Sequence, residues 1–235
     1  GFSDTTVNHF MLHKVGLPTF YGQAFLPDVC EIGADMLPYT RRYFEELIRT
    51  GHIAAVTPSD IWYETRKDFS ADQVGTAMPA YKNDGFELLR GHARFEGEIL
   101  GGCMDTIFDM FDGTRYADMP DVIRRYGLFP AAGAWRGKIL LLESSEEKPS
   151  PEKYRRALEY LRDAGVFAVV SGVLVGKPMD DTHHAAYKQA LLDVIPDMEL
   201  PIVCNLSVGH AQPRCILPFG VPAHVDADAQ VIRFG

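Results

Sequence analysis

The sequence predicts an α/β fold built on a parallel sheet, and the alternation of elements in its second half is the main reason. Apolar runs typical of buried strands occur at 138–143, 166–176 and 200–206. A helix that starts at Pro151 separates the first two runs, and a helix near 182–194 separates the second from the third. Strands that alternate with helices at this spacing form right-handed βαβ units. The carboxyl ends of all three strands then meet at one edge of the sheet, where α/β proteins bind their ligands.

The first half of the chain contains fewer regular elements. Three are predicted, a helix at 4–15, a short buried strand at 17–22 and a helix at 37–50 that ends before Gly51. Hydrophobic periodicity then fails over 52–90, a stretch rich in Asp, Gly, Pro and aromatic residues. We therefore take 52–90 as an irregular connecting segment between two parts of the chain, 1–51 and 91–235.

The second part begins with a strand and a helix. Residues 93–100 alternate well enough to predict a strand, and Gly101-Gly102 is expected to break it before an apolar helix at 104–111. The charge run at 146–148 lies before the Pro151 helix and is expected to be a solvated loop.

Composition and charge exclude several function classes. The chain has 235 residues, of which 46% are hydrophobic and 23% are charged, and its net charge is −9. These proportions exclude disordered, collagen-like and coiled-coil chains, and the negative charge argues against a nucleic-acid partner. No apolar run approaches the ~18 residues of a membrane span, so no membrane partner is expected. The four cysteines have no C-x-x-C spacing, which favours reduced thiols in a cytoplasmic protein.

The first residues have the pattern of a nucleophile turn. Ser3 stands directly before the predicted helix. A serine at a sharp turn before a helix exposes its hydroxyl, and the backbone N–H of the next residue, Asp4, then points at a developing oxyanion. Thr5 replaces the second glycine of the G-x-S-x-G pattern. A simpler alternative is that Ser3 or Asp4 only caps the helix.

An acid and a histidine follow Ser3 in one of the chain orders known for nucleophilic triads. Glu143 ends the strand at 138–143, and His210 lies four residues after the strand at 200–206. Because both strands end at the same edge, the two side chains are predicted to be neighbours, although 67 positions separate them. Each residue alone has a structural alternative, Glu143 as a loop cap and His210 as a satisfied core histidine.

Two further groups have chemical potential. His9 and His13 lie four residues apart on a predicted helix, but the Glu of H-E-x-x-H and a third ligand are missing, so we expect a packing role. Gly101-Gly102-Cys103 would present a thiol nucleophile in an amidotransferase-like enzyme, but no His-x-Glu follows to activate it. A structural or substrate-cradling turn is the interpretation we prefer for Gly102 and Cys103.

Four segments stand in order along nearly the whole chain. They are GFSDTT at 1–6, GGCM at 101–104, LESSEEKPSP at 142–151, and GH at 209–210 followed by LPFG at 217–220. Together they resemble the landmarks of the LD-carboxypeptidase family, which includes muramoyl-tetrapeptide carboxypeptidases and microcin C7 self-immunity peptidases. The resemblance implies a serine peptidase with a triad of Ser3, Glu143 and His210.

The resemblance also implies an architecture. The chain would contain the remnant of an N-terminal Rossmann-like α/β domain at 1–51 and a C-terminal domain with a parallel β/α core at 91–235. Asp4, Gly102 and Cys103 become candidates for oxyanion and substrate binding. Cys103 stands where some members have an asparagine, so a substrate contact made by that asparagine does not carry over.

The family resemblance implies a cytoplasmic homodimer without cofactor or metal, which acts on a small peptide or peptide conjugate. The first expectation is hydrolysis of an amide next to a free carboxylate in murein-type L,D-peptides. The EEKPSP continuation after 145 is closer to the microcin-immunity branch, whose substrate is a peptidyl-nucleotide. The alternative from another class is a non-catalytic α/β module that binds a small ligand.

The start of the chain departs from the family pattern. Family members have strands and helices before the nucleophile, including a Gly-rich segment that supplies part of the oxyanion hole, whereas Ser3 is the third residue here. We expect the chain to be an N-terminally truncated fragment of a longer reading frame. Because a preorganised oxyanion donor contributes around 3 kcal/mol to catalysis, little activity is predicted for the isolated fragment.

Overall fold

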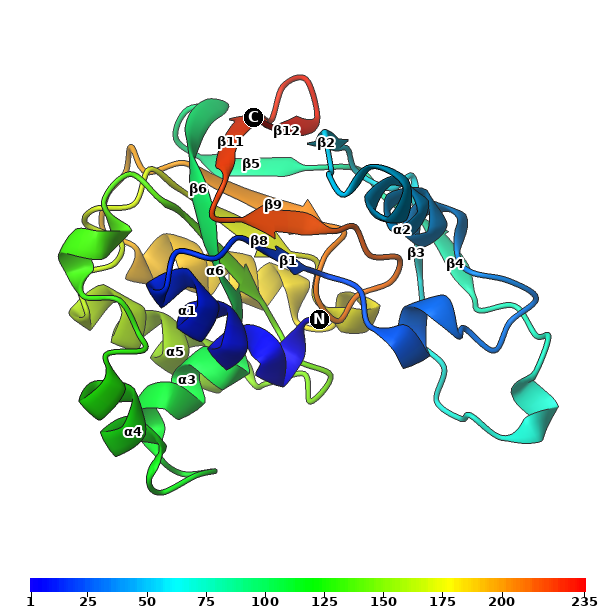
Figure 1. Ribbon diagram of the computed structural model, residues 1–235, viewed down its shortest axis with the longest axis horizontal. Coiled ribbons are helices and arrows are strands. Elements are labelled where there is room, and N and C mark those ends of the chain that lie inside the picture. Colours follow the sequence, from blue (N-terminus) through cyan, green and yellow to red (C-terminus); the bar gives the residue numbers. More distant parts are fainter.

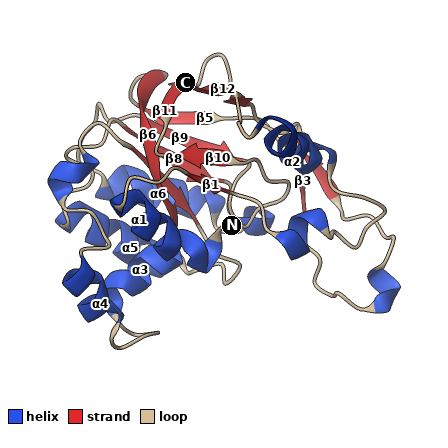
Figure 2. Ribbon diagram, viewed as in Figure 1, coloured by secondary structure: helices blue, strands red, loops and turns tan.

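The computed structural model describes residues 1–235 and is organised around an eight-stranded mixed sheet (Figures 1 and 2). The strand order is β2-β12-β11-β6-β7-β8-β9-β5. Four neighbouring strands run parallel, β6 (Arg94–Cys103), β7 (Ile139–Glu143), β8 (Gly172–Gly176) and β9 (Ile202–Leu206). The predicted α/β fold with a parallel core is confirmed, and β7, β8 and β9 are buried along their whole length.

Helices connect the parallel strands in the predicted order. α5 (Pro151–Asp163) joins β7 to β8, and α6 (His184–Val194) joins β8 to β9 and packs beside α5. Ser150 caps α5, because its Oγ accepts the backbone N–H of Lys153. α3 (Met104–Asp112) follows β6 and lies between α5 and α1, and α4 (Met119–Tyr126) packs on α3 (Figure 1).

The three elements predicted in the first 51 residues are all present. α1 (Thr6–Lys14) packs on β6, and β1 (Thr19–Tyr21) pairs antiparallel with β10 (Leu217–Phe219). α2 (Pro38–Thr50) ends at Gly51, which adopts the left-handed conformation that favours glycine at a helix end. α2 lies toward the opposite end of the molecule from α4 (Figure 1).

The segment 52–90 contains four short strands separated by irregular chain. They are β2 (Ala55–Val56), β3 (Ile61–Tyr63), β4 (Ala80–Lys82) and β5 (Glu87–Arg90). β2 and β5 occupy the two outer positions of the large sheet, while β3 and β4 form a separate hairpin. Periodicity gives no signal for strands this short. The division of the chain into domains at these residues stays a prediction.

Two predicted boundaries are wrong. The glycine pair does not break β6, which continues through it to Cys103. A Cβ on Gly101 would collide with the backbone of Leu141, so glycine lets β6 pass close to β7. The apolar run at 166–176 is a strand only from Gly172, and the residues before it are irregular, with a turn at 167–169.

One core holds these elements together. A single cluster of 48 buried residues includes Phe10 and Tyr43 from the first 51 residues and Ile53, Val56 and Phe86 from the segment 52–90. The antiparallel strands β11 (Pro222–Asp226) and β12 (Val231–Phe234), which the sequence did not predict, extend the sheet beyond β6. None of the helices has the length and apolar character needed to cross a membrane.

Candidate active site

Ser3 lies in a strained turn. Its φ of 62° is in the left-handed region, where a residue with a Cβ costs roughly 1–2 kcal/mol. Phe2 before it is extended, and the 3₁₀ turn Ser3–Thr5 leads directly into α1. This geometry matches a nucleophile elbow. No side chain caps the start of either helix, so the structure does not support the alternative in which Ser3 or Asp4 is only a cap.

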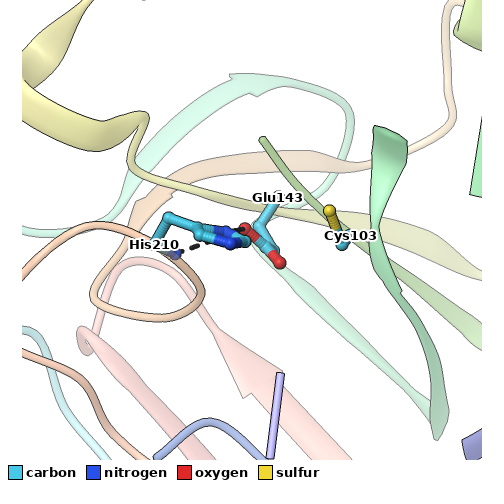
Figure 3. A group of neighbouring side chains, drawn as sticks. All are labelled: Cys103, Glu143 and His210. Carbon is cyan, nitrogen blue, oxygen red and sulfur yellow. Dashed lines mark hydrogen bonds and ion pairs between the residues drawn. The ribbon is translucent and has the colours of Figure 1, made fainter. Parts of the chain in front are cut away.

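Glu143 and His210 meet at the carboxyl edge of the sheet (Figure 3). His210 Nδ1 lies 2.7 Å from Glu143 Oε2, and the exposed fractions of the two side chains are 6% and 0%. The backbone N–H of His210 donates to the same oxygen at 3.3 Å. The predicted contact between these two residues is confirmed.

Neighbouring elements fix the Glu143 carboxylate. Tyr21 of β1 donates its hydroxyl to Glu143 Oε1 at 2.5 Å. Burial, and then the charge of Glu143, raises the pKa of Tyr21 well above its ordinary value, so the phenol stays a donor. A Cβ on Gly209 would collide with the carboxylate, and a Cβ on Gly176 would lie 2.8 Å from Glu143 Cβ. The site therefore requires glycine at both positions.

Arg214 holds the loop that carries His210. Its Nη2 donates to the His210 carbonyl oxygen at 3.0 Å, and its Nη1 pairs with Asp28 Oδ1 at 2.8 Å in a buried ion pair. The guanidinium lies over the Phe2 ring, 4.6 Å from its centroid, and that ring meets the His210 ring edge-on at 4.8 Å. Sequence reasoning missed Arg214, because its partner Asp28 is 186 positions away and no local pattern marks either residue.

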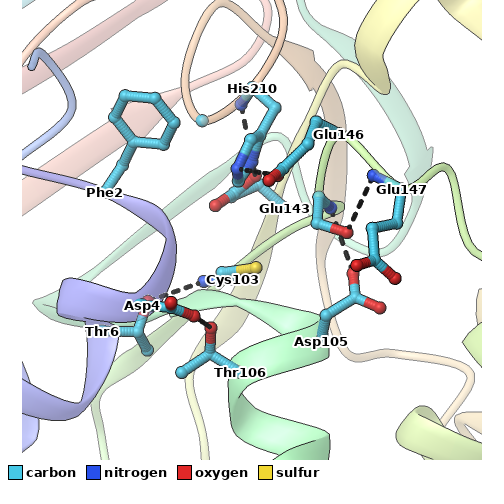
Figure 4. Close-up of polar contacts among 12 residues, drawn as sticks. Phe2, Asp4, Thr6, Cys103, Asp105, Thr106, Glu143, Glu146, Glu147 and His210 are labelled. Carbon is cyan, nitrogen blue, oxygen red and sulfur yellow. Dashed lines mark hydrogen bonds and ion pairs between the residues drawn. The ribbon is translucent and has the colours of Figure 1, made fainter.

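The second nitrogen of His210 contacts a residue that was expected to be solvated. His210 Nε2 lies 2.8 Å from Glu146 Oε2 (Figure 4), and no hydrogen bond joins His210 to Ser3. Burial disfavours the imidazolium, but Glu143 and Glu146 outweigh it and raise the pKa of His210 to about 9. The hydrogen bond from His210 lowers the pKa of Glu146 to about 2. The only sequence signal for Glu146 is its place within the family-like segment 142–151.

A cavity of about 550 Å³ opens beside Ser3 and is mostly polar, since only 2 of its 15 lining residues are hydrophobic. Ser3, Asp4, Cys103 and Glu146 all line it. Arg115, also in the lining, lies 3.4 Å from the Asp4 carboxylate. Ser3, Asp4, Cys103 and Glu146 therefore surround one space. His210 does not line this cavity but contacts Glu146, which does.

Cys103 does not have the properties of a nucleophile. Its exposed fraction is 1%, and burial, followed by the charge of Glu143, raises the pKa of its thiol well above the ordinary value. A reactive cysteine needs an exposed thiol of low pKa, so the amidotransferase-like alternative is not supported. The backbone N–H of Cys103 donates to Thr6 Oγ1 at 3.0 Å, and a Cβ on Gly102 would lie 2.5 Å from that oxygen. The turn expected at Gly102 and Cys103 is absent, because both residues belong to β6, which packs closely on α1. Cys103 lines the cavity, whereas Gly102 does not.

One group of side chains has a donor set that suits zinc. Cys103, Glu143 and His210 offer ligand atoms within 4.8 Å of one another (Figure 3). However, His210 Nδ1 and both Glu143 oxygens are already engaged in hydrogen bonds, an arrangement that fits an acid–base pair better than a metal centre.

His9, one of the two histidines on the first helix, forms a hydrogen bond with Thr19 Oγ1 at 2.7 Å, and burial lowers the pKa of His9 to about 4. The absence of metal and cofactor stays a prediction.

The chain is similar to known proteins over nearly its whole length. A family model described as the LD-carboxypeptidase C-terminal domain matches residues 96–225. The chain is 27% identical over 239 residues to a Vibrio cholerae protein named "Putative carboxypeptidase", covering 99% of this chain and 65% of that protein. It is 25% identical over 234 residues to the Microcin C7 self-immunity protein MccF of Escherichia coli, covering 97% of this chain and 62% of MccF. The chain therefore spans less than two thirds of the length of both relatives.

Solved structures show the same fold. A crystal structure of an MccF-like protein from Streptococcus pneumoniae in complex with AMP is 58% identical and has a TM-score of 0.98, covering 100% of this chain and 68% of that one. The structure of MccF in complex with aspartyl sulfamoyl adenosine is 23% identical with a TM-score of 0.78, covering 100% and 66%. The fold with its large mixed sheet is therefore that of MccF-like structures.

Proposed function

The chain belongs to the LD-carboxypeptidase family, and from this premise we propose that it carries the catalytic residues of a serine peptidase. Ser3 is the nucleophile, His210 is the general base and acid, and Glu143 is the carboxylate that orients His210. The observation that carries the proposal is the buried 2.7 Å contact between Glu143 Oε2 and His210 Nδ1. A neutral imidazole that donates Nδ1–H to Glu143 keeps the lone pair of Nε2 for a proton.

The reaction is an acyl transfer in two steps. Ser3 Oγ attacks the amide carbonyl while His210 Nε2 takes the hydroxyl proton, and His210 then gives that proton to the departing amine. In the second step a water gives one proton to His210 and attacks the acyl-Ser3 ester, and the proton returns to Ser3 Oγ as the carboxylic acid leaves. Glu143 stabilises the imidazolium in both steps.

Three other residues have supporting roles in this proposal. The backbone N–H of Asp4, at the turn after Ser3, is the oxyanion donor. The N–H of Cys103 is engaged with Thr6, so Cys103 acts through its side chain at the cavity, and Gly102 acts by letting β6 approach α1. The Asp4 assignment rests on the elbow geometry of Ser3. The Cys103 and Gly102 assignments rest on the cavity lining and on the close approach to Thr6.

The proposed substrate contains an amide next to a free carboxylate, and murein-derived L,D-peptides are the first candidate. A second candidate is a peptidyl-nucleotide of the microcin C7 type. It is favoured by one observation, the 58% identity to an MccF-like protein that was crystallised with AMP. A homodimer in the cytoplasm remains part of the proposal in either case.

A non-catalytic ligand-binding module is the alternative from another class. It predicts that Ser3, Glu143 and His210 do not converge. The close contact of Glu143 with His210, and the position of Ser3 on the same cavity as Glu146, favour the peptidase.

Labelling with a fluorophosphonate probe tests the mechanism, since an activated serine displaces fluoride from it. The wild-type chain is compared with Ser3→Ala and, as a control, with Ser70→Ala on an exposed segment. We expect labelling to disappear only in Ser3→Ala. Equal labelling of Ser3→Ala and wild type would refute the mechanism.

Hydrolysis assays on the same proteins separate the two substrate candidates. One substrate is a murein tetrapeptide with an L,D amide before its C-terminal residue, and the other is a peptide joined through an amide to adenylate. Cleavage of the first alone supports the L,D-peptidase assignment, and cleavage of the second alone supports the microcin-type assignment.

A further inference from the structure

Glu146 occupies the nitrogen of His210 that the proposed reaction needs. Its Oε2 lies 2.8 Å from His210 Nε2, while Glu143 lies 2.7 Å from Nδ1 on the other side of the ring (Figure 4). Ser3 lines the same cavity as Glu146 but has no hydrogen bond to His210. The contact with Glu146 thus stands where the proton transfer from Ser3 would take place.

This double contact fixes the protonation of the ring. A carboxylate oxygen only accepts, so an imidazole with a carboxylate on each nitrogen carries a proton on both. Such an imidazolium has no lone pair to receive the Ser3 proton. His210 can act as a base only after Glu146 leaves Nε2.

The surroundings of Glu146 let it move. Its side chain is 60% exposed, whereas that of Glu143 is completely buried. It belongs to the loop between β7 and α5, and Arg115 on the wall of the same cavity is a cation that helps to lower the pKa of Glu146. A displaced Glu146 therefore keeps a favourable charge partner near the cavity.

We propose that Glu146 is a positioning residue, which holds His210 in a doubly paired resting arrangement and must leave Nε2 before Ser3 reacts. The proposal rests on the proposed function, in which Ser3 and His210 are nucleophile and base. It adds a step that precedes acylation, the replacement of Glu146 by Ser3 at Nε2 when substrate enters the cavity.

Glu143 also raises the pKa of His210 and stays in place when Glu146 is changed, and no other group around His210 supplies a second negative charge. Glu143 from β7 stays paired with Nδ1, and Tyr21 from β1 acts only through Glu143. Cys103 from β6 is a neutral thiol, because burial raises its pKa. Arg214 contacts the His210 carbonyl oxygen, and its charge is paired with Asp28. Removal of the Glu146 charge is therefore expected to lower the pKa of His210.

The test compares Glu146→Gln with a matched control, Glu147→Gln, which removes the same charge from the next residue of the same loop without a contact to His210. The second-order rate of fluorophosphonate labelling is measured against pH, because this constant reports ionisations of the free enzyme. In the wild type the rate should rise up to a pH of about 9. In Glu146→Gln the rise should end at a lower pH, with a gain of about tenfold at neutral pH for each unit of displacement.

The rate at saturating probe supplies a second readout. It reports the complex, in which Glu146 has already left Nε2, so its pH dependence should be the same in wild type and Glu146→Gln. If Glu146 had only a structural role, Glu146→Gln would not shift the pH dependence of the second-order rate while leaving that of the rate at saturating probe unchanged. If Glu146→Gln and Glu147→Gln give the wild-type profile for both rates, the proposal is wrong.

Nuclear magnetic resonance keeps the inference separate from the proposed function. The ring nitrogens of His210 are titrated in wild type, Glu146→Gln and Glu147→Gln, with no need for reactivity. A lower titration midpoint in Glu146→Gln alone supports the contact, and equal midpoints in all three proteins overturn it. If Ser3 is never labelled while the midpoint still moves, the serine-peptidase assignment fails and the contact of Glu146 with Nε2 stands.

Discussion

The two ring nitrogens of His210 face two different parts of the molecule. Nδ1 meets Glu143 at the end of β7, where Tyr21 of β1 and Gly176 of β8 enclose a completely buried carboxylate. Nε2 meets Glu146 on the loop that follows β7, and the side chain of Glu146 is 60% exposed. A carboxylate fixed between strands is a permanent partner for the imidazole, whereas one on an exposed loop is an exchangeable partner.

Substitution of the buried carboxylate should have the largest effect. Glu143→Gln keeps the volume of the side chain but removes the charge that stabilises the imidazolium and sets the tautomer. We expect the rate of fluorophosphonate labelling to fall by about 10⁴-fold, as for the equivalent change in serine-protease triads. Glu147→Gln is the control for charge removal in the same region. A loss of less than tenfold would show that Glu143 is not the orienting acid.

A side chain added at Gly209, next to Glu143, should lower the free energy of unfolding. Gly209 has a φ of 83°, and a Cβ there would collide with Glu143 Oε2, whereas Gly75 has a φ of 78° and no atom within 4 Å of its added Cβ. Gly75→Ala therefore measures only the cost of placing a residue with a Cβ in the left-handed backbone conformation, roughly 1–2 kcal/mol. Gly209→Ala adds the collision, so its free energy of unfolding should fall by about 2–5 kcal/mol in total. Urea unfolding measures the free energy of unfolding of both variants. Equal losses would mean that Glu143 and its neighbours move to accommodate the added Cβ.

The same contrast explains what the sequence could predict. The contact of Glu143 with His210 was predictable, because apolar runs mark β7 and β9 and parallel strands end at a common edge. The contact of Glu146 was not, since a charged residue in a loop has no periodicity, and the solvated interpretation is the ordinary outcome for such a run.

Long-range contacts and very short strands were not predicted, for related reasons. Arg214 and Asp28 meet across 186 positions, and nothing in either local sequence signals the other. β2 has two residues and β5 has four, so neither exceeds the shortest run, about four residues, over which alternation can be recognised. The fold class therefore follows from patterns within single elements, while the support of the His210 loop depends on tertiary packing.

Protonation of His210 should contribute to stability in a defined pH range. Burial lowers its pKa, but the two carboxylates raise it to about 9, above the ordinary value of 6.5. The stabilisation is therefore complete below the unfolded-state pKa and is lost as the pH rises through about 9. Between about pH 6 and pH 9.5, the stability advantage of wild type over His210→Gln should shrink by up to about 3 kcal/mol. An advantage that grows with pH in urea unfolding would contradict the raised pKa.

The smallest effect is expected for the exposed carboxylate. The pKa of Glu146 falls to about 2 because of its hydrogen bond from His210, but a side chain that is 60% exposed gains little from an ion pair, because solvent screens the charge and the side chain loses freedom. Glu146→Gln should therefore change the free energy of unfolding at neutral pH by less than about 1 kcal/mol. Urea unfolding of Glu146→Gln beside Glu147→Gln provides the measurement. A loss well above that of Glu147→Gln would mean that the loop after β7 is held by Glu146, so that the two sides of His210 are equally fixed and the exchange at Nε2 has a high cost.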